Sequence, residues 1–155
     1  MSSSVRFCPA FFHPRYWLTW FGVTVLFLLV QLPYPVLIRL GALFGRLSRP
    51  FLKRRETIAR RNLKLCFPTL NAQKQERLIA GNFASLGMAL VETGIAWFWP
   101  NERIRKLFDV QSLQILQRAR ENKRGVMVVG VHFMSLELGG RAMGQCQPMM
   151  AMYRP

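Results

Sequence analysis

Cysteine is scarce in this sequence, and the few cysteines lie far apart. Cys8, Cys66 and Cys146 are the only three among 155 residues, and no Cys-x-x-Cys pair occurs. This spacing excludes both a disulfide framework and a cysteine zinc site. We therefore expect free thiols in a reducing compartment. Internal repeats and low-complexity segments are also absent.

Acidic residues are nearly as rare. Seven Asp and Glu oppose 22 Lys and Arg, which gives a formal net charge of +15. This balance predicts an anionic partner: nucleic acid, an acidic protein or a phosphate-bearing membrane surface. Because 51% of the residues are hydrophobic, the chain is not a disordered basic tail and can bury a core. Its length suits one domain, or one domain with an anchor.

One long segment, from Tyr16 to Ile38, has no charged residue at all. A membrane-spanning helix needs about 20 mostly apolar residues, and aromatic rings cluster at one end of this segment, as they do at headgroup level. Pro33 and Pro35 predict a break in the helix. We expect residues 16–38 to be a membrane anchor or a deeply interfacial helix. A cleaved signal peptide or a soluble core helix is the alternative, although no small-residue cleavage site follows.

The charges around this segment predict its orientation. Only Arg6 and Arg15 precede it, whereas nine basic residues and a single acid, Glu56, lie between Arg39 and Lys64. The positive-inside rule puts the C-terminal side in the cytoplasm, and each basic residue adds about 1 kcal/mol of attraction to an anionic leaflet. A merely solvated basic helix is the alternative. The stretch carries no nucleic-acid signature, so a nucleic-acid binder is a distant third possibility and we expect no nucleic-acid partner.

Helices are predicted for the middle of the chain. Asn71 is a suitable cap for a long amphipathic helix that begins at Ala72 and ends before Pro100. The aromatic cluster at residues 97–99 indicates either ordinary core or a surface that contacts acyl chains or the bilayer. Shorter helices are expected over residues 101–106 and 113–121, the second capped by Ser112.

A short β-branched run, residues 126–131, predicts a buried parallel strand, and hence an α/β layer. His132 follows this strand at its C-terminal end, where catalytic groups collect in open α/β sheets. Glu137 falls in the first turn of the next helix, with Ser135 as its cap. A neutral imidazole can take a proton from a hydroxyl, and a carboxylate on its other nitrogen fixes the tautomer. The spacing alone is weak evidence for such a pair, and by itself it favours a histidine bonded to backbone and a glutamate at a helix start.

The stretch VMVVGVHFMSLELGG contains the H-x4-E form of the H-x4-D/E motif of glycerolipid-type acyltransferases. Longer stretches extend the similarity over essentially the whole chain: HPRYWLTWFG, QLPYPVLIRLG, RPFLKRRETIARRNLKLCFP, NFASLGMALVETGIAWFWP and QPMMAMYRP. Together they resemble the late acyltransferases of lipid A biosynthesis in Gram-negative bacteria. Within that family the sequence is most similar to the palmitoleoyl-transferring members, and next to the lauroyl-transferring ones.

The resemblance implies transfer of a fatty acyl chain from acyl carrier protein to a hydroxyl of a (Kdo)2-lipid IVA-type phosphorylated glycolipid. The palmitoleoyl chain is favoured and the lauroyl chain is the alternative. The reaction is expected at the cytoplasmic face of the inner membrane. In that chemistry His132 deprotonates the acceptor and Glu137 orients the imidazole, with no metal, cofactor or covalent enzyme intermediate. Tyr153 and Arg154 match the family's second block, where Arg154 contacts phosphate unless it is only a surface charge. Arg141 is a further substrate-binding candidate.

The expected organisation has three parts: an N-terminal segment at 1–15, distal to the cytoplasm or interfacial, the anchor at 16–38, and the first part of an acyltransferase domain at 39–155. Family members run to roughly twice this length, so the resemblance implies only the start of the α/β sheet. We therefore expect little or no activity from these 155 residues alone, and an inactive membrane-anchored fragment is the alternative to an enzyme.

Overall fold

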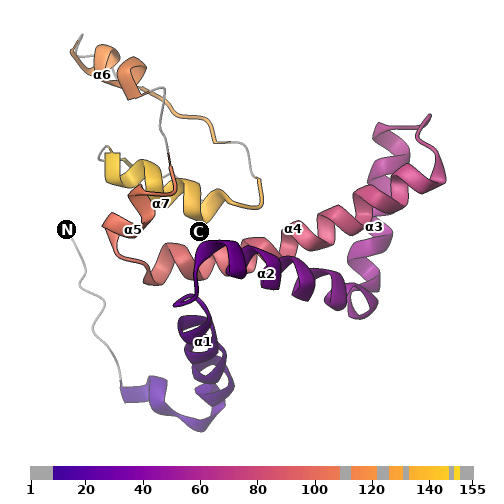
Figure 1. The fold of residues 1–155 in the computed structure, drawn as a ribbon, viewed down its shortest axis with the longest axis horizontal. Helices are drawn as coiled ribbons and strands as arrows, with labels where there is room; N and C mark the ends of the chain where they lie inside the picture. Colours follow the sequence, from indigo (N-terminus) through magenta and orange to yellow (C-terminus); the bar gives the residue numbers. More distant parts are fainter. Residues whose placement is uncertain (1–8, 109–112, 122–125, 131–132, 147–148, 151–155) are drawn as a thin grey trace.

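The computed structural model describes residues 9–108, 113–121, 126–130, 133–146 and 149–150 of the chain. Every regular element within them is helical, and they contain no strand (Figure 1). Three short 3-10 helices are η1 (Pro9–Phe12), η2 (Pro14–Tyr16) and η3 (Arg49–Phe51). The α-helices are α1 (Trp17–Leu29), α2 (Tyr34–Ser48), α3 (Lys53–Cys66), α4 (Ala72–Phe98), α5 (Asn101–Arg105), α6 (Leu113–Glu121) and α7 (Leu136–Cys146).

The long helix α4 is the centre of the fold. It contacts α1, α2, α3 and α7, and its apolar side chains at three- to four-residue spacing are buried, including Ile79, Phe83, Val91 and Ile95. The predicted cap is confirmed, because the Asn71 side-chain oxygen accepts the Lys74 N–H at 2.8 Å. Residues 113–121 form the predicted helix as well, although its proposed cap, Ser112, lies outside the described residues.

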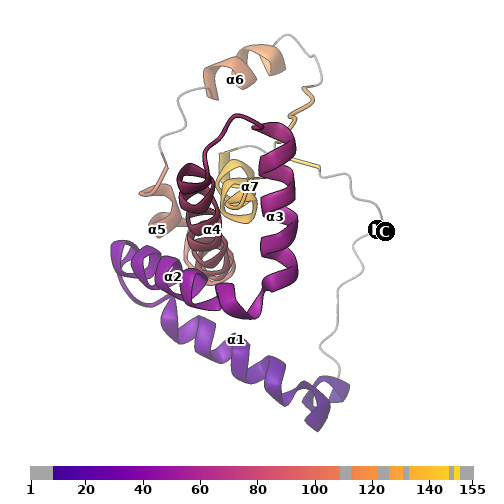
Figure 2. The same cartoon turned by 90° about the vertical axis from the view of Figure 1, so that its right-hand side faces the viewer.

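Glycines allow α2 and α4 to pack backbone against backbone. A Cβ atom on Gly45 would overlap the carbonyl oxygen of Phe83, and one on Gly87 would overlap that of Gly41. Alanine at either position would therefore push the two helices apart. The lack of side chains at these glycines explains why α2 and α4 run closely together in both views (Figures 1 and 2).

The uncharged segment 16–38 forms two helices rather than one. α1 ends at Leu29 and α2 begins at Tyr34, immediately after Pro33, so the break predicted from the prolines is present. The 13 residues of α1 measure about 20 Å, against about 30 Å for the hydrocarbon core of a bilayer. Figure 2 shows α1 extending away from α2 and α4, and four of its apolar side chains, Trp17, Leu18, Phe21 and Leu28, are 62–81% exposed.

Among the described residues, α4 alone is long and apolar enough to cross a membrane. It is also the helix against which α1, α2, α3 and α7 pack, which is the position of a core helix. Its length and hydropathy are therefore explained by its place in the fold.

The aromatic cluster at the end of α4 serves two different environments. Trp99 is 4% exposed, and its indole Nε1 donates to the Val30 carbonyl oxygen at 2.6 Å. The Arg103 guanidinium lies 3.5 Å from the centre of the Trp99 ring and donates to the Leu32 carbonyl oxygen at 2.9 Å. Trp97, in contrast, is 60% exposed. The core interpretation is thus confirmed for Trp99, and the surface interpretation remains open to Trp97.

Two arginines and two glutamates join η3, α3 and α4. Arg49 and Arg60 both contact Glu56, at 2.7 and 2.6 Å, and both contact Glu76, at 2.5 and 2.7 Å. The hydrogen bonds from Arg49 and then Arg60 lower the pKa of the Glu56 carboxyl to about 2. Part of the basic stretch is therefore occupied in holding α3 beside α4.

The predicted buried strand differs most from the structure. Residues 126–130 have no regular secondary structure, and Val126, Met127, Val128 and Val129 are 48–86% exposed. A strand is stabilised by backbone hydrogen bonds to a neighbouring strand, and no other described segment offers such a partner. The helical part of the predicted fold is present, whereas the α/β sheet is not found in the described residues.

Candidate functional site

Helix α7 carries the acidic member of the H-x4-E motif. Its buried residues Leu138 and Ala142 pack the helix against α4 and α5. Ser135 directly precedes the helix, as predicted, and its carbonyl oxygen accepts the Gly139 N–H at 2.9 Å. Glu137 falls in the first turn and is exposed, so its carboxylate is available to a neighbouring group.

The other predicted site residues are only partly described. His132, Tyr153 and Arg154 lie outside the described residues, so the pairing of His132 with Glu137 and the phosphate contact of Arg154 stay predictions. Arg141 is exposed, and its Nη2 donates to the Asn101 side-chain oxygen at 2.8 Å. This bond ties α7 to the start of α5, a structural role that the sequence did not suggest.

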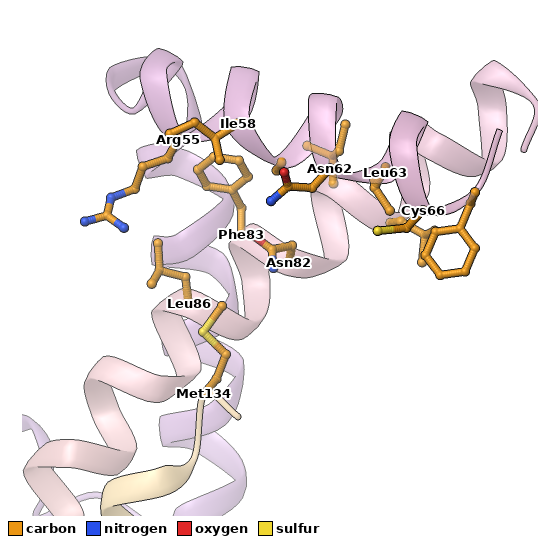
Figure 3. A pocket seen from close by; sticks show the side chains of 13 residues that line it. Arg55, Ile58, Asn62, Leu63, Cys66, Asn82, Phe83, Leu86 and Met134 are labelled. Atoms are coloured by element: carbon orange, nitrogen blue, oxygen red, sulfur yellow. The ribbon is translucent and has the colours of Figure 1, made fainter. Parts of the chain in front are cut away.

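A groove between α3 and α4 ends next to the motif. We call it the α3/α4 groove, and its volume is about 520 Å³. Figure 3 shows Ile58, Asn62 and Leu63 on the α3 side facing Phe83 and Leu86 on the α4 side. Met134, two residues after His132 in the sequence, closes one end. The groove therefore ends at a residue of the H-x4-E motif.

The chemistry of the α3/α4 groove suits an amphiphilic ligand. Its walls are mostly apolar, with the polar side chains of Asn62, Asn82 and Arg55 among them. Volume and lining are typical of small-molecule sites, in which a few polar groups orient a largely apolar ligand. Sequence analysis missed this site. A sequence signal for the groove exists in two matching four-residue spacings, Ile58–Asn62–Cys66 in α3 and Leu78–Asn82–Leu86 in α4. The many basic residues around the first of them favoured an interpretation of that stretch as a membrane-surface segment instead.

A second groove lies between α1, α2 and α4, nearer the C-terminal end of α4. Its volume is about 720 Å³, and apart from Thr19 and Thr93 its lining is apolar. Leu43 and Phe44 of α2, Val25 of α1 and Trp97 of α4 lie along it and are all exposed. We call it the membrane-side groove, because such an exposed apolar surface is typical of contact with lipid or another apolar partner.

No group of three or more His, Cys, Asp or Glu in the described part of the chain is arranged to hold a metal ion. Cys66 and Cys146 are exposed free thiols. Cys66 lines the α3/α4 groove, whereas Cys146 ends α7 away from it.

Comparison with known proteins gives a consistent result. A family model described as bacterial lipid A biosynthesis acyltransferase matches residues 5–155. The lipid A biosynthesis palmitoleoyltransferase of Escherichia coli (strain K12) is 67% identical over all 155 residues, and the lipid A biosynthesis lauroyltransferase of the same organism is 48% identical over the same length. A lipid A biosynthesis acyltransferase of Haemophilus influenzae is 44% identical over 97% of this chain.

The chain spans about half the length of these curated relatives: 51% of the two from Escherichia coli and 48% of the one from Haemophilus influenzae. No solved structure matches it significantly.

Proposed function

This chain belongs to the bacterial lipid A biosynthesis acyltransferase family, and we propose that it supplies the catalytic motif and part of the lipid site for transfer of a fatty acyl chain to a lipid A precursor. The observation that carries the proposal is the 67% identity to a palmitoleoyltransferase across the whole chain, H-x4-E motif included. The identity to a lauroyltransferase is lower, at 48%, and this difference favours a palmitoleoyl donor over a lauroyl donor.

The proposed reaction needs one base. The His132 imidazole takes the proton of an acceptor hydroxyl, and the oxygen attacks the carbonyl carbon of an acyl thioester. The new C–O bond forms, the C–S bond breaks, and the departing thiolate receives the proton back from the imidazolium. Glu137 stabilises that imidazolium and fixes its tautomer. The exposure of Glu137 at the start of α7 supports this role.

We further propose acyl carrier protein as the thioester donor and a phosphorylated lipid IVA-type glycolipid as the acceptor. Acyl carrier protein is acidic and the acceptor carries phosphates, so the net charge of +15 on this chain favours both encounters. Arg154 and Tyr153, in the family's second block, are the candidates for the phosphate contact.

An acyl-transfer assay tests the function. The protein as encoded by its gene is incubated with palmitoleoyl- or lauroyl-acyl carrier protein and a lipid IVA acceptor, and the acylated glycolipid is measured by mass spectrometry. We expect product with the palmitoleoyl donor at a higher kcat/KM than with the lauroyl donor. No product with either donor from the folded protein would overturn the proposal.

The α3/α4 groove is our candidate for the acyl chain, and Cys66 provides a probe of it. In the absence of acceptor, palmitoleoyl-acyl carrier protein should slow the reaction of Cys66 with N-ethylmaleimide by about tenfold at about ten times Kd, because a bound chain covers the thiol. Labelling at each cysteine is followed by mass spectrometry. Cys146 is the matched control, and equal protection of both thiols, or of neither, would contradict an acyl chain in this groove.

We also propose that the protein works at the cytoplasmic face of the inner membrane, with α1 inserted into the bilayer. The exposed apolar side chains of α1 and the membrane-side groove support insertion. Arg39 and Arg46 of α2 are exposed and, among the described residues, have no acidic partner. They would lie at the level of anionic headgroups.

Cys66 also reports orientation. A variant with this single cysteine (Cys8→Ser, Cys146→Ser) should react with a membrane-impermeant maleimide in inside-out vesicles and stay unlabelled in sealed right-side-out vesicles, because α3 follows the basic side of the segment. Detergent permeabilisation, which should make it reactive in both, is the control. Labelling of Cys66 in sealed right-side-out vesicles would contradict the proposed orientation.

A further inference from the structure

A half-buried carboxylate of α4 lies close to the helix that carries the acidic member of the motif. Glu92, in the C-terminal third of α4, has one hydrogen-bond partner among the described residues: the Tyr34 hydroxyl, which donates to its Oε1 at 3.3 Å. Tyr34 is the first residue of α2. A carboxylate that has lost part of its hydration and has a single neutral partner is costly unless further donors reach it.

Those donors are available across a small cavity. The cavity has a volume of about 180 Å³, with Glu92 and Tyr34 on one wall and, on another, Ser135 just before α7 and Leu138 and Gly139 within it. This is the first turn of the helix that carries Glu137 and begins four residues after His132. The α4 carboxylate and the start of the motif helix thus line the same cavity.

The first turn of α7 has backbone N–H donors that lack an acceptor among the described residues. The Leu136 N–H is bonded to the Phe133 carbonyl oxygen at 3.2 Å, but no described acceptor is bonded to the N–H groups of Glu137 or Leu138. Such donors are left over at every helix N-terminus, where a carboxylate is electrostatically favoured. A cavity of this size accommodates several water molecules, each of about 30 Å³, and the side chains of Tyr34, Glu92 and Ser135 offer them polar partners.

We propose that Glu92 is a positioning residue for the H-x4-E motif: Tyr34 orients its carboxyl, which binds the first turn of α7 through water in the shared cavity. The link fixes the helix that carries Glu137 relative to α4. Its relevance to catalysis rests on the proposed acyl transfer, whereas the link itself does not. Glu92 touches no reacting atom in this scheme and acts only through α7.

Hydrogen–deuterium exchange of the full chain in detergent tests the link. In Glu92→Leu, which keeps size but removes the acceptor, amides of the first turn of α7 should exchange about tenfold faster, which corresponds to about 1.4 kcal/mol. The N-terminal half of α4 should be unchanged. Glu92→Gln keeps an acceptor oxygen and should recover most of the protection.

Thr93→Val is the matched control. It removes a hydroxyl from the next residue of α4. Among the described residues this hydroxyl bonds only the Ala89 carbonyl oxygen of its own helix, and Thr93 does not line the cavity. Its α7 exchange should equal wild type. Unchanged α7 exchange in a folded Glu92→Leu protein would overturn the proposal. If that variant loses protection along all of α4, Tyr34→Phe decides: faster exchange confined to α7 supports the link, and wild-type exchange overturns it.

Activity provides a separate readout. In the acyl-transfer assay Glu92→Leu should lower kcat by about tenfold with KM for the donor unchanged, and Glu92→Gln should restore most of kcat, because only the placement of Glu137 is disturbed. A rise in KM with unchanged kcat would argue for substrate binding rather than positioning. If wild type transfers no acyl chain, the proposed function fails while the exchange experiment still judges the link.

Discussion

Replacing His132 with Gln should lower kcat for acyl transfer by about 10²- to 10⁴-fold, with a much smaller effect on KM for the donor. Glutamine is of similar size and keeps a hydrogen-bonding side chain, but it cannot accept the hydroxyl proton at neutral pH. Loss of a base acts on the transition state, so the fall appears in kcat and in kcat/KM together. Steady-state kinetics with palmitoleoyl-acyl carrier protein and a lipid IVA acceptor provide the measurement.

Glu137→Gln tests the same pair from the other side. An amide at this position no longer stabilises the imidazolium, so kcat should fall by about 10² or more, and the double variant should be little worse than His132→Gln alone. Additive losses, or near-normal turnover in His132→Gln, would show that the two residues do not act as one unit. Glu102→Gln is the control, because it neutralises an exposed carboxylate on α5 that lies outside the motif.

Trp99→Ala should have the largest effect on stability, about 3–5 kcal/mol. The substitution removes a buried ring, leaves the Val30 carbonyl oxygen without its donor and leaves the Arg103 guanidinium without the ring beneath it. Because Val30 and Leu32 belong to the connection between α1 and α2, the corner below the proposed membrane segment should loosen first. Chemical denaturation in a mild detergent, followed by circular dichroism, measures the loss.

Two variants bracket that result. Trp99→Phe keeps most of the buried area and loses only the indole N–H, so it should cost about 1–3 kcal/mol. Trp97→Ala, two residues away and exposed, should stay within about 1 kcal/mol of wild type in detergent. Equal losses at the two positions would contradict the division of this aromatic cluster between core and surface.

Local signals in the sequence predicted most of the helices. The Asn71 cap, the four-residue spacing of apolar residues in α4 and Pro100 after it are all short-range features, and each is present in the structure. The different burial of Trp97 and Trp99 could not be predicted from such local features. It depends on where the connection between α1 and α2 contacts the end of α4, which is a long-range property.

The predicted strand is not found in the described residues, for a related reason. Val126, Val128 and Val129 have high strand propensity, but propensity describes how well a residue fits a sheet that other segments must provide. The described residues supply helices only. The α3/α4 groove was missed because it arises from two helices facing each other, whereas the motif that marks His132 and Glu137 is contiguous and could be found by resemblance.

The contact between Gly45 and Gly87 has a mechanical consequence. Helices separated by a layer of side chains can shift relative to each other when rotamers change. Two backbones in direct contact have no side-chain layer that could adjust in this way. We therefore expect α2 and α4 to move together as one rigid unit. In the proposed membrane-bound state, a tilt of the N-terminal end of α2 would therefore also tilt α4, and the orientation of the helical body would follow from how α1 lies in the bilayer.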